Sequence, residues 1–595
     1  MRNIYFIVAT AFISLMTVMM PCSAQYAMTN VYGRDHVLLN GKWDAVIDPY
    51  KHGRKIQIYN DCPLKNKTDF KEYAWEGGLR LNVPGDWNSQ QPELNYYEGT
   101  IWYARHFSIN EQIKGNLFLH FGAVNYHCTV YLNGVMVGSH EGGFTPFQIN
   151  ITDQACIGDN FLVVEVDNTR SADAIPAFHY DWWNYGGITR DVMLIKTPEI
   201  YIDNYFIQLD KEESKLIRAK VCLSEKISNK QVTVEIPELH LKEQIVTDSD
   251  GRAETTFRVK KLERWSPENP KLYSVRLSFG EDVIEEQIGF RNINVKGTQI
   301  LLNDKPFFYK GISFHEEIAS RKGRAYSQED ALLLLTEAKE LGANVVRLAH
   351  YPQNEYIVRL AEKMGLLLWE EIPIWQGIDF TNEHILEKAK NMYAEMVMRD
   401  RNRCALSFWG IANETKASDA RNYFLRQMIE HCKSIDNTRL ITAAFDNVKF
   451  NSDTNTFELK DTLSNYLDFV SINKYMGWYM AWPTKPSKLN WNITPNKPLV
   501  FSEFGGEAQY GQAGEPDVAS SWSENYQEQL YKNNIEMFDE IPNLAGISPW
   551  ILFDFRSPFR FHPINQECWN RKGLISDRGY RKKAWYIIKD YYSRH

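Results

Sequence analysis

The chain is poor in cysteine, and its few cysteines are scattered. There are 8 among 595 residues, and Cys22 falls within a predicted signal peptide. The remaining seven, at positions 62, 128, 156, 222, 404, 432 and 568, include no CxxC pair. An odd, dispersed set argues against both a disulfide framework and a zinc site. We therefore interpret these cysteines as small buried hydrophobes.

An excess of positive charge is also absent. The formal net charge is -8, with 67 basic and 75 acidic side chains. Proteins that bind nucleic acid use clustered Lys and Arg to neutralise phosphates. We therefore expect no nucleic-acid partner.

Long apolar runs are missing after residue 24. No later stretch approaches the roughly 20 consecutive apolar residues of a membrane-spanning helix. The first 24 residues combine Arg2, an apolar stretch from Ile4 to Met20, and the small residues Cys22-Ser23-Ala24. This order is typical of a cleaved secretory signal peptide. We expect a secreted protein located in a bacterial periplasm. A lipid anchor on Cys22 is the weaker alternative, because Met19-Met20-Pro21 is a poor lead-in to a lipidated cysteine.

Aromatic residues, in contrast, are plentiful at 13% of the chain. Their flat apolar rings pack cores, and sugar rings also stack on them, so the composition favours a carbohydrate partner without establishing one.

Two all-β regions come first along the chain. Residues 25–198 contain short β-branched or aromatic runs at 118–124, 128–132 and 161–167, and Asn133-Gly134 is a strong hairpin signal. We expect a jelly roll or sandwich here. Residues 199–292 alternate in the same manner, and their length suits an immunoglobulin-like sandwich.

From residue 293 to 595, apolar strands alternate with helical stretches. A helix is predicted at 331–341, between Ser327 as N-cap and Gly342 as stop, and another at 355–364. A doubly wound sheet is the competing fold, but eight strands favour a closed (β/α)8 barrel. The strands are expected at 307–313, 344–349, 366–372, 405–412, 440–444, 469–473, 498–501 and 544–552.

Polar residues follow several of these strands. In a (β/α)8 barrel the carboxyl ends of the strands surround the active site, so Glu414 and Glu503 should both face the barrel mouth, at the ends of the fourth and seventh strands. The same position at the end of a predicted strand is expected for His315, Arg347, His350, Glu370, Glu371, Asn473, Tyr475 and Trp550.

Two facing carboxyl groups can hydrolyse a glycosidic bond. At a separation of about 5 to 5.5 Å, one acts as nucleophile and the other as acid and then base, with retention of configuration. The apolar neighbours of Glu414 would raise its pKa, and a cation such as Arg347 would keep the partner ionised.

Four ordered motifs in the barrel region resemble glycoside hydrolase family 2, the β-galactosidase, β-glucuronidase and β-mannosidase group. They are NVVRLAHYP at 344–352, WEEIP at 369–373, IANE at 411–414 and SEFG at 502–505. Segments at 130–134, 142–147 and 265–270 resemble the two β domains of that family.

The resemblance implies roles for these residues. Glu414 would be the acid/base and Glu503 the nucleophile. Asn413 would bind the sugar 2-hydroxyl, and Tyr475 and Arg347 would steady the nucleophile.

Substrate choice is less defined by the sequence. Asp181 and the segment from Asn473 to Tyr479 resemble pocket residues of β-glucuronidases, and Asn570-Arg571-Lys572 matches their Asn-x-Lys pattern for the uronate carboxylate. A surface Lys572 without a ligand is the alternative. The spacing of Arg556, Arg560 and His562 differs from that of β-glucuronidases, which leaves a second carboxylate-binding arginine in doubt.

We therefore predict a β-glucuronidase without cofactor that acts on oligo- or polysaccharide-derived β-glycosides. The alternatives are a β-galactosidase, an α-L-arabinopyranosidase, a β-galacturonidase or a non-catalytic carbohydrate-binding protein. His315-Glu316-Glu317 lacks the HExxH spacing of a zinc site, so His315 is expected near the sugar instead. Trp478 and Trp550 are expected to form a wall for stacking sugar rings. Homo-oligomerisation stays open.

Overall fold

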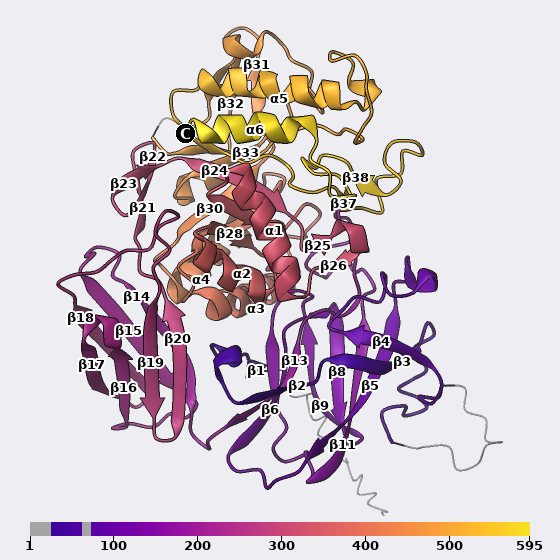
Figure 1. Cartoon of the computed structure of the whole chain (residues 1–595), viewed down its shortest axis with the longest axis vertical. Helices are drawn as coiled ribbons and strands as arrows, with labels where there is room; N and C mark the ends of the chain where they lie inside the picture. The colour runs from indigo at the N-terminus through magenta and orange to yellow at the C-terminus, as the bar shows by residue number, and fades with distance from the viewer. Residues whose placement is uncertain (1–24, 62–72, 495) are drawn as a thin grey trace, which may run out of the picture.

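The computed structural model describes residues 25–61, 73–494 and 496–595. Two β-sandwiches, indigo and magenta in Figure 1, lie against one side of a barrel coloured from pink to yellow. The predicted signal peptide at residues 1–24 lies outside the described residues.

The first sandwich packs a five-stranded sheet, β1-β10-β6-β13-β2, against a six-stranded sheet, β4-β3-β5-β11-β8-β9. Asn133 and Gly134 join β8 to β9 with φ of 52° and 82°, so the predicted hairpin turn is confirmed. The strands are β1 (Gln25–Tyr26), β2 (His36–Leu38), β3 (Gly41–Ile47), β4 (Leu79–Val83), β5 (Thr100–Ile109), β6 (Asn116–Phe121), β8 (His127–Leu132), β9 (Val135–Glu141), β10 (Phe147–Asn150), β11 (Gly158–Asp167) and β13 (Val192–Thr197), with a separate pair formed by β7 (Val124–Asn125) and β12 (Gly187–Ile188).

The second sandwich has sheets β14-β15-β18 and β17-β16-β19-β20, whose alternating apolar side chains form one core. A small sheet, β21-β22-β23, then leads into the barrel. The strands are β14 (Ile202–Leu209), β15 (Leu216–Leu223), β16 (Gln231–Ile236), β17 (Leu241–Val246), β18 (Arg252–Arg258), β19 (Tyr273–Phe279), β20 (Asp282–Ile288), β21 (Ile293–Lys296), β22 (Gln299–Leu302) and β23 (Lys305–Phe307).

Eight parallel strands close into a barrel in the order β24-β27-β28-β29-β30-β33-β35-β36. The predicted closed barrel is confirmed, and the doubly wound sheet is excluded. The strands are β24 (Tyr309–Phe314), β27 (Val345–Leu348), β28 (Leu367–Glu371), β29 (Leu406–Asn413), β30 (Leu440–Phe445), β33 (Val470–Asn473), β35 (Leu499–Glu503) and β36 (Leu544–Ile547).

Helices surround the barrel and begin at residues that the sequence predicts. Ser327 accepts a hydrogen bond from the Asp330 amide at 3.2 Å, which caps α1, and Gly342 ends this helix with φ of 94°. In the part of the chain that the structure describes, no helix is long and apolar enough to cross a membrane. The helices are α1 (Gln328–Leu341), α2 (Glu355–Met364), α3 (Glu383–Asp400), α4 (Asp419–Ile435), α5 (Glu524–Asp539) and α6 (Lys583–Ser593).

The last barrel strand is shorter than predicted. β36 ends at Ile547, so the expectation of a strand through Leu552 is wrong for its final five residues. The apolar run continues because Ile551 and Leu552 are buried under the loops that follow, not because the strand goes on. The loops that follow the barrel strands contain three small sheets: β25 (Glu317–Ile318) with β26 (Gly323–Arg324), β31 (Lys449–Asn451) with β32 (Thr456–Glu458) and β34 (Asn490–Asn492), and β37 (Phe555–Arg556) with β38 (Trp569–Asn570).

Candidate active site

A pocket of about 570 Å³ opens at the carboxyl ends of the barrel strands. It is lined by barrel residues and by Asp181 from the first sandwich. Most of the sequence-predicted site residues line it together: Asp181, Glu414, Asn473, Tyr475, Tyr479, Glu503, Trp550, Asn570 and Lys572.

Glu503 is the last residue of β35 and sits between two hydrogen-bond donors. Arg347 donates from Nη1 to Oε1 at 2.8 Å, and the Tyr475 hydroxyl donates to Oε2 at 2.6 Å. Burial and the nearby charge of Glu503 hold the pKa of Tyr475 well above its usual range, so the phenol stays a donor. This arrangement stabilises an ionised carboxylate on Glu503.

Glu414 follows the last residue of β29, in the left-handed region with φ of 51°. Asn473 donates to its Oε1 at 2.9 Å, and Gln376 donates to its Oε2 at 3.1 Å. Burial raises the pKa of Glu414 to about 8, and the charge of Glu503 adds to the effect. At neutral pH Glu414 is therefore mostly protonated.

The two carboxyl groups belong to one hydrogen-bonded unit. Asn473 is the register partner of Glu503 across β33 and β35, and its side chain contacts both Glu414 and Asn413. Arg347 in turn binds Asn413 at 2.8 Å as well as Glu503. Both carboxyl groups thus line one pocket and are held by the same hydrogen-bonded framework.

Arg347 and Asn413 do not line the pocket but lie directly behind it. Arg347 is fully buried and also binds Glu371 at 2.9 Å. Burial alone would raise the pKa of Glu371, but Arg347 and His350 lower it to about 2. Within residues 25–61, 73–494 and 496–595, the buried Nδ2 of Asn413 has no hydrogen-bond partner, so this donor can serve a ligand.

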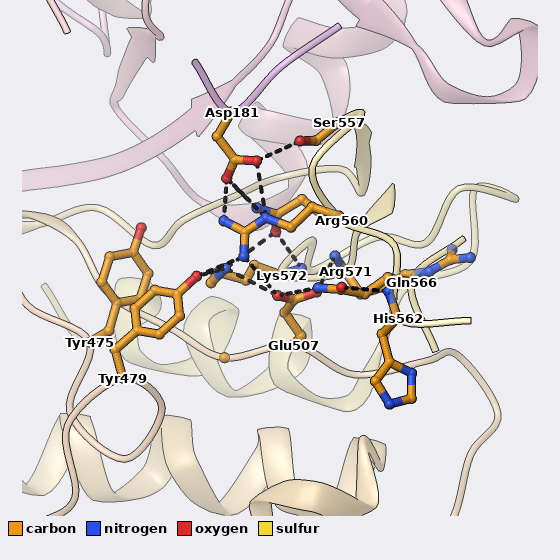
Figure 2. A network of polar contacts seen from close by, with 12 residues as sticks. Asp181, Tyr475, Tyr479, Glu507, Ser557, Arg560, His562, Gln566, Arg571 and Lys572 are labelled. Atoms are coloured by element: carbon orange, nitrogen blue, oxygen red, sulfur yellow. Dashed lines mark hydrogen bonds and ion pairs between the residues drawn. The ribbon is translucent and has the colours of Figure 1, made fainter. Parts of the chain in front are cut away.

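Figure 2 shows a second polar cluster, in which Asp181, Arg560 and Lys572 line the same pocket as the carboxyl pair. Asp181 accepts hydrogen bonds from Arg560 Nε at 3.0 and 3.1 Å and from Ser557 at 2.6 Å. Burial would raise the pKa of Asp181, but Arg560 and Lys572 hold it below its usual range. The first domain therefore contributes an anion that fixes a barrel cation at the pocket.

Lys572 lies beside Arg560 in this cluster (Figure 2). Its ammonium donates to the Tyr479 hydroxyl at 2.8 Å and pairs with Glu507 at 3.3 Å. Arg560 Nη1 donates to the same Tyr479 hydroxyl at 3.0 Å. Two cations thus converge on one point of the pocket wall, where Tyr479 is half exposed.

Asn570 completes this wall. Its side chain donates to Asp181 at 3.1 Å, and its Oδ1 accepts from the Lys572 amide at 3.2 Å. The interpretation of Lys572 as a surface side chain is wrong, because this residue is 1% exposed.

Three expectations about the pocket are corrected by the structure. His315 lies behind the wall, packed between Trp550 and Phe555, and not at the sugar site. Burial lowers its pKa well below the usual range, so it is a neutral core histidine. Trp478 packs on Trp522 outside the pocket, so only Trp550 of the predicted pair lines it. Glu370 points away to Arg399 at 3.0 Å.

Some pocket residues were missed by the sequence reasoning. Gln376 follows β28 by a few residues, Asp446 comes directly after β30, and neither carries a motif. Glu507, in the loop after β35, does not line the pocket but supports it through its pair with Lys572. Arg560, whose spacing left its role in doubt, does reach the pocket, whereas Arg556 packs over Trp183 and His562 lies against Trp522.

Comparison with known families matches the whole described architecture. Residues 38–198 match the sugar binding domain of glycosyl hydrolases family 2, residues 200–291 a second domain of that family, and residues 293–594 its TIM barrel domain.

Known relatives match most of this chain. A β-glucuronidase of Paenibacillus borealis is 26% identical over 93% of this chain and 96% of its own, and a putative β-glucuronidase of Formosa agariphila is 28% identical over 87% and 67%. Among solved structures, a β-glucuronidase from an uncultured Clostridium species has a TM-score of 0.81 at 26% identity, covering 96% of this chain and 100% of that one. A galacturonate-bound β-galacturonidase from Eisenbergiella tayi has a TM-score of 0.80 at 25% identity, covering 96% and 99%. With three consecutive family domains and this pair of carboxyl groups, the chain belongs to glycosyl hydrolases family 2 and is a glycosidase.

Proposed function

We propose that this glycosidase is a retaining, exo-acting β-glucuronidase in which Glu503 is the nucleophile and Glu414 the acid/base. The observation that carries the proposal is a single pocket lined by Glu503, which accepts from Arg347, by Glu414, whose pKa is raised to about 8, and by the cations Lys572 and Arg560.

In the first step, the Glu503 carboxylate attacks the anomeric carbon while Glu414 gives its proton to the glycosidic oxygen. The bond to the leaving group breaks, and a glycosyl ester forms on Glu503. In the second step, Glu414 removes a proton from water, which attacks the same carbon and frees Glu503. Two inversions give net retention.

The groups around the pair suit this chemistry. Arg347 and Tyr475 hold Glu503 with two donors, which keeps the attacking oxygens oriented. The unpartnered Nδ2 of Asn413 is the donor that we assign to the sugar 2-hydroxyl. Trp550 is assigned to one flat face of the sugar.

The uronate carboxylate is assigned to the wall formed by Lys572, Arg560 and Asn570. The Tyr479 hydroxyl already accepts from both cations, so an anionic oxygen placed beside it or in its place would receive two charge-assisted hydrogen bonds. The names of the relatives support the same class of substrate.

A β-galacturonidase is the second candidate. Galacturonate also carries the carboxylate that Lys572 and Arg560 would bind, and differs from glucuronate at C4. The similarity to the Eisenbergiella tayi enzyme favours this alternative.

We also propose export to the periplasm, because the first 24 residues have the charge, the apolar run and the small residues of a signal peptide.

The test is a panel of nitrophenyl glycosides run on the wild type and on Lys572→Ala. We expect the wild type to prefer the β-glucuronide to the β-glucoside, which differs only in lacking the carboxylate. Loss of the ammonium should lower kcat/KM for the glucuronide about 100-fold, with a smaller loss for the glucoside, because a charged hydrogen bond is removed.

Three outcomes would change the assignment. A preference for the β-galacturonide would support the second candidate. Activity on the β-galactoside alone would contradict a uronide substrate altogether. An unchanged kcat/KM for the glucuronide in Lys572→Ala would remove Lys572 from the carboxylate wall.

A further inference from the structure

Glu414 lies at the boundary of two pockets. A second pocket of about 620 Å³ shares Glu414, Gln376 and Asp446 with the first. Gln376 reaches Glu414 Oε2 at 3.1 Å from this side, whereas Asn473 holds Oε1 from the other. The acid/base carboxyl is therefore accessible from both pockets.

The chemistry fixes which part of a substrate each pocket receives. The sugar that is attacked must lie between Glu503 and the wall of Lys572 and Arg560. The acid must contact the oxygen that joins this sugar to the leaving group. Since Glu414 marks the end of the first pocket, the leaving group extends past it into the second.

Lysine side chains dominate the second pocket. Lys416, Lys449 and Lys460 all line it, and all three are exposed. Lys460 pairs with Glu458 at 3.0 Å. Among the described residues, Lys416 and Lys449 have no ion-pair or side-chain hydrogen-bond partner. Two cationic groups at the leaving-group side are thus available to a ligand.

The acidic groups of this pocket offset the lysines only in part. The pKa of Glu414 is raised to about 8, and the exposed Asp446 can offset no more than one of the two unpaired lysine charges. A further cation, Lys474, lies at the junction, because it lines the first pocket and its ammonium donates to the Val448 carbonyl at 3.2 Å. The leaving-group side therefore carries net positive charge.

Ordered elements hold two of these lysines in place. Lys449 begins β31, and Lys460 lies just after β32, in the small sheet β31-β32-β34. The rings of Phe457 and Trp491 stack in this sheet with centroids 4.3 Å apart. Lys416 approaches from the turn after β29, two residues beyond Glu414. The three lysine side chains therefore reach one pocket from two separate segments of the chain, the turn after β29 and the small sheet β31-β32-β34.

We propose that the second pocket is a leaving-group subsite for an anionic saccharide, in which Lys416 and Lys449 bind a carboxylate or sulfate on the sugar that is released. The proposal rests on the glycosidase function proposed above and specifies the substrate on the other side of the cleaved bond. The natural substrate would then be an acidic oligosaccharide and not an uncharged conjugate.

The experiment compares three β-glucuronyl disaccharides: one whose reducing sugar is unsubstituted, one in which it carries a sulfate, and one in which it is a uronic acid. We expect a higher kcat/KM for either acidic disaccharide than for the unsubstituted one. Lys416→Ala and Lys449→Ala should each lower this ratio about threefold, and the double variant about tenfold, as for partly exposed ion pairs. High salt should reduce the ratio in the wild type.

Lys433→Ala is the matched control, because Lys433 is an exposed lysine on α4, away from both pockets. It should keep the wild-type ratio. Equal kcat/KM for the three disaccharides, or a ratio unchanged in the double variant, would overturn the subsite while leaving the glycosidase intact. No hydrolysis of any disaccharide or nitrophenyl glucuronide would instead refute the proposed function. The sulfated and uronic substrates show which anion the lysines prefer.

Discussion

At the scale of single residues, the two carboxyl groups differ through their neighbours. Glu503 accepts from a guanidinium and a phenol, whereas the side chain of Glu414, among the residues that the structure describes, accepts only from the neutral amides of Asn473 and Gln376. Burial without a cation favours the protonated form, and contact with a cation favours the charged one. The roles of acid and nucleophile that we propose therefore follow from which strand end carries each group.

Glu414→Gln should lose most activity on substrates with poor leaving groups. We expect kcat to fall by about 10³-fold on a disaccharide, since proton donation is removed, with a much smaller loss of the first step on a dinitrophenyl glycoside. In the wild type, activity should decline as pH rises through about 8, because Glu414 then loses its proton. The measurement is the pH profile of both proteins.

Added azide provides the control for this variant. It should restore turnover on the activated substrate and give a β-glycosyl azide, because azide needs no general base. If Glu414→Gln kept the wild-type decline near pH 8, another group would be responsible for it.

At the scale of secondary-structure elements, closure of the barrel depends on a short seam. β24 and β36 pair over only Tyr309 with Gly546 and Lys310 with Ile547. A Cβ atom on Gly546 would lie 2.3 Å from the carbonyl oxygen of Tyr309. Only glycine allows this close approach of the two backbones.

Gly546→Ala should therefore lower the free energy of unfolding by about 1–3 kcal/mol, the usual cost of overpacking. Thermal unfolding of the purified protein checks this expectation. Gly78→Ala is the control, because its nearest atom would lie at an ordinary 3.4 Å. Equal melting temperatures for the two variants would contradict the role of the seam.

How much the sequence predicts also differs between elements. The predicted bounds of β29 and β35 lie within two residues of the observed ones, because apolar runs between turn signals define buried strands. The carboxyl ends of these two strands therefore predict where Glu414 and Glu503 lie. The loop that carries Arg560 has no hydrophobic periodicity that would reveal it in the sequence. The Arg560 side chain is oriented by Asp181, which is 379 residues away in sequence. The true end of β36 was hidden because Ile551 is as buried as a strand residue.

At the scale of the whole molecule, the first sandwich and the barrel share the site. Arg190, after β12, donates to Glu316 at 3.1 Å and to the Pro352 carbonyl at 2.7 Å, and both charged groups are buried. These buried contacts of Arg190 fix the domain that carries Asp181. A separate interface joins the second sandwich to the barrel, where Trp265 donates to the Glu362 carbonyl of α2 at 2.8 Å.

Arg190→Met should cost about 3 kcal/mol of stability, because Glu316 remains buried with the Asn354 amide as a hydrogen-bond donor and Arg324, at 3.4 Å, as its remaining cation. Calorimetry should show a lower melting temperature, and kcat/KM for the glucuronide should fall as Asp181 is displaced. Arg80→Met is the control, since its pair with Asp44 is exposed and contributes less than about 1 kcal/mol. Equal effects of both variants would mean that the interface is not held by the buried pair.

The central claim is that Glu503 becomes covalently attached to the sugar during turnover. Incubation with a 2-deoxy-2-fluoro-β-glucuronyl fluoride slows release of the glycosyl ester, and peptide mass spectrometry then locates the label. The account predicts one fluoroglucuronyl group per chain, on Glu503, with loss of activity in proportion. A label on any other residue, or inactivation without a covalent adduct, would contradict it.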